Sequence, residues 1–368
     1  MRGSGIGVSA CKTKGNVRES ERRKNGTVQN SFLKNKMVTY EKADGAYNER
    51  MQQSVFFVVF VIIGSIVGAG FISGAELVRF FPDRGFLPYL LLMSLVSFGM
   101  IAFFLFAGKR CNGFDGMQRK VFGKREKAVK TVFLLNSFVS SAVMFAGLRE
   151  LSSMLFPGFP FLLPFGFAVT VCVCRGGERG IGKFNFVFVP VLILTMLILL
   201  FRKGDFSYPK PSGYNAFYSV LFAVLYSGMN VLPAIPLLTD MGSTARHGTL
   251  SAFLATLTVG ALAGVALCAI RNAGDNVALA PMPLVVVLQS GVLFPILATV
   301  AVLTSLAADY YPVWQFFQKK KRATLSRLAV LACAVGISFF GLSNLVTYLY
   351  PITGFLGLIY TLICAFRL

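Results

Sequence analysis

The sequence predicts an all-α polytopic membrane protein with about ten transmembrane helices, and three observations lead to this fold class. Of the 368 residues, 55% are hydrophobic and only 14% are charged, whereas soluble domains carry about 25% charged residues. The apolar residues gather in runs long enough to cross a bilayer, which takes roughly 20 residues in a helix. The Lys and Arg residues stand in short segments between these runs. We therefore expect lipid, rather than water, to surround most of the chain.

Residues 1–50 differ in composition from the rest of the chain. They are rich in Lys, Arg, Asn, Ser and Gly and show no sustained periodicity, so they cannot bury enough apolar surface to offset the entropy cost of ordering. We expect a disordered basic cytoplasmic tail over residues 1–50 and a transmembrane domain over residues 51–368. Met37 and Met51 could each be the true start, in which case the tail is not part of the natural protein.

Ten apolar segments are expected to span the membrane. The first, from Ser54, is too long for a signal peptide and should remain as the first helix. The fourth is short, and the stretch Ala280–Gln289 before the eighth contains two prolines and is expected to form a short helix or a re-entrant piece. The predicted spans are residues 54–81, 86–107, 130–155, 159–174, 184–202, 213–239, 248–270, 289–316, 323–341 and 344–366.

The distribution of basic residues predicts the orientation of these spans. With the N-terminus in the cytoplasm, 29 of the 36 Lys and Arg residues fall in cytoplasmic segments and seven fall outside. Cytoplasmic loops of membrane proteins carry such an excess of positive charge. The net charge of +21 is therefore explained by topology and not by nucleic-acid binding, and both termini are expected in the cytoplasm.

The spacing of the spans indicates an internal repeat. Spans 1 and 6 begin near Ser54 and Gly213, and spans 3 and 8 begin near Lys130 and Gln289, so both pairs are about 159 residues apart. Because five spans per half is an odd number, the second half must be inverted relative to the first. We expect repeats over about residues 54–202 and 213–368, an architecture that many secondary transporters share.

Two spans at corresponding positions are predicted to be broken helices. The first contains four glycines within eleven residues, and each glycine costs a helix about 1 kcal/mol relative to Ala; the sixth contains Gly228 and two prolines. Paired interruptions point to a transporter's binding site, because lipid cannot satisfy unwound backbone. Released N–H groups near Gly70–Gly74 and Met229–Asn230 would take an anionic group of a solute. The alternative is that the glycines only allow close helix packing.

The predicted solute-binding residues come from both breaks. One of them, Glu76, is ionisable and lies at membrane depth. Because a charge is costly there, such a residue is taken to have a function. It could take up a proton, bind a substrate amine or hold a gate, and the alternative is an ion pair with Arg79 on the same helix face. The predicted set is Gly68, Gly70, Phe71, Ser73, Gly74, Glu76, Tyr226, Gly228 and Asn230.

Other polar and aromatic residues in the apolar runs have more than one interpretation. Asn136 and Asn185 could bridge helices or touch a solute. Asp240 and Asp309 are expected near cytoplasmic helix ends, where a charge can reach water. Three aromatic residues are predicted to be anchors at the lipid interface; they are Tyr310, Tyr311 and Trp314.

The first break carries a family resemblance. The run Val67–Phe71 (VGAGF), followed by Ser73-Gly74 and Glu76, resembles the first-helix signature of the YkvI-type bacterial membrane proteins, and the resemblance extends from about residue 54 to the C-terminus. More distantly, the break resembles the unwound first helix of transporters with the LeuT fold, the amino acid–polyamine–cation superfamily. The resemblance implies five plus five inverted helices, with helices 1 and 6 broken, in a bacterial plasma membrane. Residue 75 is Ala where the family often has a polar residue, so no polar contact is expected there.

The same resemblance implies a cation site. In sodium-coupled members of that fold, one Na⁺ ion lies between backbone carbonyls of the first helix and a carbonyl and paired hydroxyls of the eighth. Carried over to this chain, the ligands are the carbonyls of Gly64, Val67 and Ala301 and the hydroxyls of Thr304 and Ser305. Such oxygen ligands suit a hard cation. The alternative is that both hydroxyls bond to carbonyls of their own helix.

The sequence favours a transporter and offers no sign of an enzyme. It has no phosphate loop, no nucleophile–His pair and no HExxH motif, and its seven cysteines lack metal-ligand spacing. We expect no cofactor, with Na⁺ or H⁺ as the coupling ion. The predicted function is ion-coupled secondary transport of a small polar or zwitterionic, amino-acid-like solute by alternating access. The alternative is a non-transporting membrane scaffold or signalling protein with the same fold. The expected partners are the solute and the lipid bilayer, and not nucleic acid.

Overall fold

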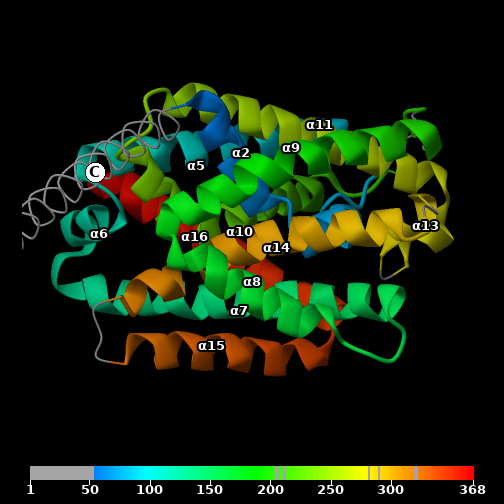
Figure 1. Ribbon diagram of the computed structural model, residues 1–368. Helices are drawn as coiled ribbons and strands as arrows, with labels where there is room; N and C mark the ends of the chain where they lie inside the picture. Colours follow the sequence, from blue (N-terminus) through cyan, green and yellow to red (C-terminus); the bar gives the residue numbers. More distant parts are fainter. Residues whose placement is uncertain (1–53, 204–206, 210–212, 281, 289–290, 319–321) are drawn as a thin grey trace, which may run out of the picture. The chain divides into compact units, whose positions relative to one another are not determined.

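The computed structural model describes residues 54–203, 207–209, 213–280, 282–288, 291–318 and 322–368. The predicted tail at residues 1–50 lies outside the described residues. Residues 52–368 form one compact unit, and the regular structure within its described part is helical (Figure 1).

Every predicted span corresponds to helix in the described residues. Eight of these helices are long and apolar enough to cross a membrane, and α2 and α8 are shorter apolar helices. The first span contains α2 (Val55–Ile66), α3 (Ala69–Ser73) and α4 (Ala75–Phe80), and the others are α5 (Leu87–Cys111), α7 (Glu126–Leu155), α8 (Leu162–Arg175), α9 (Gly177–Lys203), α10 (Ala216–Gly242), α11 (Gly248–Asn272), α14 (Leu293–Phe316), α15 (Ala323–Ile337) and α16 (Leu342–Arg367).

Short helices connect some of the spans. One of them, α13, falls within the stretch Ala280–Gln289, where a short helix is predicted. In Figure 1, α6 and α13 lie towards opposite ends of the helix bundle. The connecting elements are α6 (Phe114–Phe122), η1 (Gly123–Arg125), α12 (Asp275–Ala278), α13 (Pro283–Leu288) and η2 (Ser338–Phe340).

The broken first span lies between two well-buried helices. Helix α2 packs against both α10 and α14, and also against α9 and α11. Helix α10 packs mainly against α5 and α16, whereas α14 packs against α7, α8 and α9. Helix α15 contacts α7 and runs along its outer side (Figure 1). Large apolar side chains on the outer helices are exposed, such as Leu194 on α9 and Phe366 on α16, as expected for surfaces that face lipid.

The predicted break in the first helix is present. Helix α2 ends at Ile66, and Gly68 is extended before α3 begins at Ala69. A second interruption falls at Gly74, whose φ of 83° lies in the left-handed region between α3 and α4. Only glycine adopts this conformation without a steric penalty. The polar backbone of the break is buried inside the protein, as membrane depth requires.

The predicted break in the sixth span is wrong. Helix α10 is continuous from Ala216 to Gly242, with Pro233 and Pro236 inside it. Each proline removes one backbone N–H and leaves the carbonyl of the preceding turn without its helical partner, but tight packing and side-chain donors allow a helix to continue in this setting. In the turn that follows the prolines, the Thr239 hydroxyl donates to the carbonyls of Ile235 and Pro236 at 2.7 and 3.0 Å, which are not the carbonyls that the prolines leave free. Because the helix is unbroken, Met229–Asn230 cannot offer the released N–H groups expected there.

Helices α10 and α16 meet at glycines. A Cβ atom on Gly228 would lie 2.3 Å from the carbonyl oxygen of Gly354, and one on Gly357 would lie 2.2 Å from the carbonyl oxygen of Gly228. No side chain fits between the two backbones at this crossing. Gly228, predicted from the sequence as a solute-binding residue, therefore has a packing role, which is the small-residue arrangement common between membrane helices.

Candidate functional site

Two of the five residues expected to bind Na⁺, Gly64 and Ser305, are in contact where α2 faces α14. The Ser305 hydroxyl donates to the carbonyl of Gly64 at 2.8 Å, and the Thr304 hydroxyl donates to the carbonyl of Ala301 at 2.7 Å. Both hydroxyl side chains are completely buried. The fifth residue, Val67, directly follows α2 and is also buried. Thr304 thus bonds within its own helix, as the alternative interpretation expected, whereas Ser305 bonds across to the first span.

A third helix reaches the same end of α2. Asn185 of α9 is fully buried, and its Nδ2 donates to the carbonyl of Val61 at 3.5 Å. A Cβ atom on Gly64 would lie 2.6 Å from Nδ2 of Asn185, so only glycine leaves room for this amide. The Oδ1 atom of Asn185 has no hydrogen-bond partner within the described part of the chain. The sequence marks Asn185 as a polar residue in an apolar run but gives no sign that it faces Gly64.

Glu76 lies at the other side of the break and is buried, with 3% of its surface exposed. The Tyr226 hydroxyl of α10 donates to Oε2 of Glu76 at 3.4 Å, and the carboxyl also has a hydrogen bond with Tyr350 of α16. A Cβ atom on Gly70 would lie 1.8 Å from Oε1 of Glu76. Tyr226 and Glu76, predicted from separate spans, are therefore brought together.

The alternative interpretation of Glu76 as half of an ion pair is wrong. The Arg79 guanidinium instead donates to the hydroxyl and carbonyl of Thr347, at 2.5 and 3.4 Å. None of the ion pairs between described residues involves Glu76. The Glu76 carboxyl is held by two tyrosine hydroxyls and has no cation beside it among the described groups.

Of the other predicted solute-binding residues, Ser73 and Asn230 bond to nearby backbone. The Ser73 hydroxyl donates to the carbonyl of Gly70 at 2.9 Å and accepts the N–H of Ala75 at 3.3 Å. Asn230 donates to the carbonyl of Tyr226 in its own helix at 3.0 Å. Phe71 is fully buried.

Two residues that the sequence analysis did not select also belong to this region. Met144 of α7 accepts the N–H of Ala69 on its sulfur at 3.4 Å, and its methyl carbon would lie 2.6 Å from a Cβ atom on Gly68. Tyr350 holds Glu76. Both lie in apolar runs and carry no pattern that would distinguish them from other buried side chains.

Asp309 departs from its predicted place. It is buried, with 3% of its surface exposed, and its carbonyl accepts a hydrogen bond from the Ser137 hydroxyl of α7. Its carboxylate lies near enough to Glu76 for the two acids to interact electrostatically. The prediction that Asp309 reaches water at a helix end is therefore wrong, because α14 continues beyond it to Phe316.

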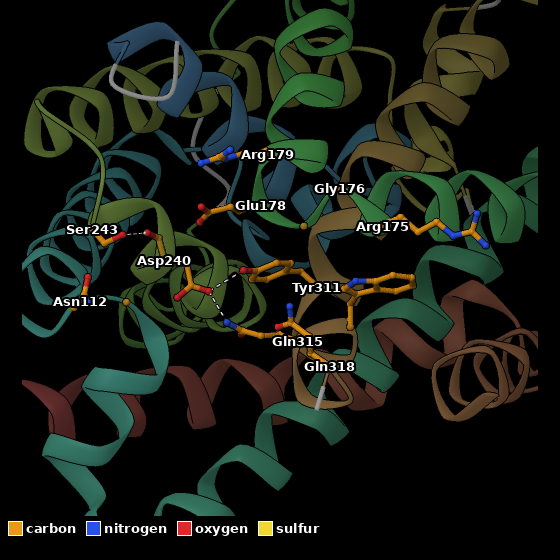
Figure 2. Close-up of a pocket in the computed structure, with 13 residues that line it drawn as sticks. Asn112, Arg175, Gly176, Glu178, Arg179, Asp240, Ser243, Tyr311, Gln315 and Gln318 are labelled. Carbon is orange, nitrogen blue, oxygen red and sulfur yellow. Dashed lines mark hydrogen bonds between the residues drawn. The ribbon is translucent and has the colours of Figure 1, made fainter. Parts of the chain in front are cut away.

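Asp240 lies near the end of α10, as predicted, beside a cavity of about 470 Å³. Its carboxylate accepts the N–H of Phe114, the Tyr311 hydroxyl and the Gln315 side-chain amide, each at 2.8 Å. Figure 2 shows the bonds from Asp240 to Tyr311 and Gln315, and all three residues line this cavity together with Glu178 of α9. Asp240 thus joins α10 to α14 and to the start of α6.

The aromatic residues predicted as interface anchors have other roles. Tyr310 and Tyr311 are buried, and Tyr311 is bonded to Asp240. The guanidinium of Arg327 lies 4.1 Å from the ring centroid of Trp314. These contacts place the aromatic groups inside the packed helix end rather than on a lipid-facing belt.

No protein-family model matches the sequence, but two curated proteins do. The chain is 23% identical over 334 residues to the uncharacterized protein YyaD of Bacillus subtilis (strain 168), a match that covers 83% of this chain and 94% of YyaD. It is 28% identical over 213 residues to the uncharacterized membrane protein YkvI of the same strain, which covers 53% of this chain and 60% of YkvI. The resemblance to YkvI seen in the first span is therefore confirmed by weak homology.

Solved structures share the arrangement of helices. The crystal structure of MhsT in complex with L-phenylalanine matches with a TM-score of 0.62 and 16% identity, over 85% of this chain and 88% of MhsT. The Eremococcus coleocola manganese transporter matches with a TM-score of 0.61 and 13% identity, over 85% and 78%. The chain has the LeuT fold.

A third LeuT-fold structure supports the same assignment. Mhp1, a nucleobase-cation-symport-1 family transporter, matches with a TM-score of 0.52 and 14% identity, over 86% of this chain and 75% of Mhp1. These proteins are transporters rather than enzymes. Within the LeuT fold, the break in the first span of this chain lies between α10 and α14, where the buried Glu76 and Ser305 contacts are found.

Proposed function

We propose that the chain is an ion-coupled secondary transporter that carries a small polar or zwitterionic, amino-acid-like solute by alternating access. The observation that carries this proposal is the break between α2 and α3, where the Gly64 carbonyl is bonded to Ser305 of α14. An unwound segment at membrane depth leaves polar backbone groups that a solute and a cation can use. The LeuT fold of the chain supports a transporter over a scaffold protein.

Glu76 supports a solute with an amino group. Its carboxyl is buried beside Tyr226 and Tyr350 and has no cationic partner among the described groups. A buried charge is stable only when an opposite charge or several hydrogen bonds compensate it. The ammonium group of a zwitterionic solute would supply that charge.

The composition of the break favours an organic solute over a transition metal. Although the E. coleocola protein is a manganese transporter, the described residues of this chain contain no group of three or more His, Cys, Asp or Glu that could hold a metal ion. MhsT has been crystallised with L-phenylalanine, which supports an amino-acid-like solute for a protein of this fold.

The oxygen atoms between α2 and α14 suit Na⁺ as the coupling ion. The carbonyls of Gly64, Val67 and Ala301 and the hydroxyls of Thr304 and Ser305 are uncharged oxygen ligands. Hard oxygen donors bind hard cations, and a set without carboxylates leaves a doubly charged ion uncompensated. Sodium would hold the end of α2 against α14. A proton on Glu76 is the other candidate for coupling.

Counterflow in proteoliposomes tests the proposal. Liposomes loaded with an unlabelled amino acid should accumulate the same labelled amino acid, and the uptake should require the reconstituted protein. Amines and nucleobases serve as the comparison solutes, and each is measured in NaCl and in KCl. Thr304→Ala with Ser305→Ala is the matched variant, because it removes two hydroxyls without adding bulk. No exchange of any solute class by correctly inserted protein would favour the non-transporting alternative.

A further inference from the structure

A groove of about 430 Å³ lies between the start of α7 and the end of α16. We propose that it binds one anionic phospholipid, with the phosphate on two arginines and an acyl chain against apolar side chains. The site is separate from the break in the first span and does not depend on the solute or on the coupling ion. Its lining includes Arg125, Val129, Val132, Ile363, Phe366 and Arg367.

Charged and apolar groups follow one another along the groove in the order of a phospholipid. Arg125 directly precedes α7, and Val132 lies roughly 10 Å further along that helix. Arg367 is the last residue of α16, and Ile363 lies one turn before it. The C-terminus lies beside α6 (Figure 1), so both arginines are at this end of the bundle. The apolar residues of both helices therefore lie deeper in the spans than the arginines.

The Arg125 guanidinium is available to an anion. The ion pairs between described residues include neither Arg125 nor Arg367. The two acidic residues closest to Arg125 in the sequence, Asp115 and Glu126, are both bonded to Lys130, at 2.6 and 2.5 Å. Residues 109–130 contain eight Lys and Arg residues and only these two acidic ones, so the segment has an excess of positive charge.

Arg367 brings a second guanidinium to the same groove. Its Nη1 donates to the carbonyl of Val121 at 3.1 Å, which fixes the side chain against the end of α6 and leaves other N–H groups unused. A guanidinium binds a phosphate through two parallel N–H···O bonds. Two such groups at one end of a groove match the phosphate of a lipid head group.

The apolar part of the groove favours a lipid over a free anion. The Val132 side chain is 42% exposed and the Phe366 side chain is 88% exposed, and in a membrane-spanning chain such surfaces meet acyl chains. Inorganic phosphate would leave this apolar lining uncovered. Basic pockets between transmembrane helices bind the head groups of anionic lipids.

Thermal unfolding of the purified full-length protein in an uncharged detergent tests the proposal. Midpoints are measured over a series of phosphatidylglycerol concentrations and, separately, of phosphatidylcholine, which has the same chains and phosphate but no net charge. Half of the stabilisation should need about 10-fold less phosphatidylglycerol than phosphatidylcholine. Added KCl should reduce this difference, because salt screens exposed charges.

Two variants test the two parts of the site. Arg125→Gln should lose most of the preference for phosphatidylglycerol, whereas the matched control Lys124→Gln, which removes the same charge outside the groove, should keep it. Val132→Trp should also lose the preference, because the indole fills the space of the acyl chain while both arginines remain. Its control is Val191→Trp on α9, since Val191 is exposed and lies outside the groove.

Three results would overturn the proposal. Equal stabilisation of the wild type by the two lipids would mean that lipids only surround the protein. The same stabilisation by inorganic phosphate would assign the arginines to a free anion. A full preference for phosphatidylglycerol in both Arg125→Gln and Val132→Trp would place the anionic lipid elsewhere on the protein.

Discussion

The hydroxyl of Ser305 donates a hydrogen bond of 2.8 Å to the carbonyl of Gly64, and this bond connects α14 to the end of the broken first helix. A cation bound to both oxygens would replace the bond, because the hydroxyl must then turn its lone pairs, and not its proton, towards the site. Ser305 and Gly64 can therefore hold the end of α2 against α14 in two ways. In one the Ser305 hydroxyl donates to the Gly64 carbonyl, and in the other both oxygens bind the same cation.

The first prediction concerns sodium. Replacing KCl by NaCl at constant ionic strength should stabilise the wild type by RT ln(1 + [Na⁺]/Kd), which is about 1.4 kcal/mol at ten times Kd. Thr304→Ala with Ser305→Ala should erase this increment, because the remaining carbonyls coordinate poorly without the hydroxyls. The measurement is the thermal unfolding midpoint of the purified protein in each salt. A full increment in the double variant would show that sodium binds elsewhere.

The second prediction concerns the glycines of the break. Gly70→Ala would place a Cβ atom 1.8 Å from Oε1 of Glu76, so solute binding should be lost as the carboxyl is displaced. Gly74→Ala puts a side chain at a φ of 83° and should cost about 1–2 kcal/mol of stability. Binding is measured by solute-dependent thermal shift, with Gly99→Ala on α5 as the control, since its Cβ would meet nothing within 4 Å. Normal binding by both variants of the break would make these glycines packing devices only.

The third prediction concerns a proton as the coupling ion. Glu76→Gln keeps a polar group between Tyr226 and Tyr350 but cannot exchange a proton. If a proton drives transport, the variant should lose the pH dependence of uptake while counterflow of the solute continues, and the hydroxyls of Thr304 and Ser305 should be dispensable. Uptake is measured in proteoliposomes over a range of external pH, with Tyr226→Phe as the companion variant that keeps the carboxyl. An intact pH response in Glu76→Gln, together with no sodium effect in the wild type, would point to a facilitator or to a non-transporting protein.

The fourth prediction concerns Asp240. Its carboxylate accepts three hydrogen bonds at 2.8 Å from Phe114, Tyr311 and Gln315, and hydrogen bonds to charged groups contribute about 1.5–3 kcal/mol each. Asp240→Ala should therefore lower the thermal midpoint clearly more than Tyr311→Phe, which removes one of the three. Equal midpoints for the wild type and Asp240→Ala would show that the cluster contributes little to stability.

The fifth prediction concerns orientation. On a cysteine-free background, a cysteine at position 123 should react only with reagents on the cytoplasmic side, and one at position 275 only with reagents outside. Gly123 follows α6 and has open space around it, and the Asp275 side chain is 70% exposed, so both positions are accessible. Positions 205 and 320, which lie outside the described residues, should behave like 275 and 123. The reverse labelling would invert the predicted topology.

Much of the fold could be predicted because lipid imposes simple rules on the sequence. Apolar length identified the spans, and the glycines of the first span identified its break. The prolines of the sixth span were misleading. Pro233 and Pro236 remove backbone donors, but in a tightly packed membrane helix this does not end the helix, so proline is a weaker break signal than a run of glycines.

The candidate site was only partly predictable because the role of a polar side chain depends on whether it is buried and what it contacts, and the sequence does not show either. Glu76 and Tyr226 were selected for their polarity and do meet, whereas Asp309 was placed near water by its distance from a loop and is buried. Tyr350 and Met144 could not be selected, since side chains of their types occur throughout the apolar runs. Gly228 was selected as a solute-binding residue and faces α16 instead.

The contact between Gly228 and Gly357 has a mechanical consequence. Two backbones in direct contact leave no room for a side chain to move between them, so α10 and α16 are expected to stay packed together and to rotate as one rigid body. Both Tyr226 on α10 and Tyr350 on α16 are bonded to Glu76. The distance between these two tyrosines would then stay the same during that rotation. The Glu76 carboxyl would then gain or lose both tyrosine hydrogen bonds at the same time, so it would have two alternative environments and no intermediate one.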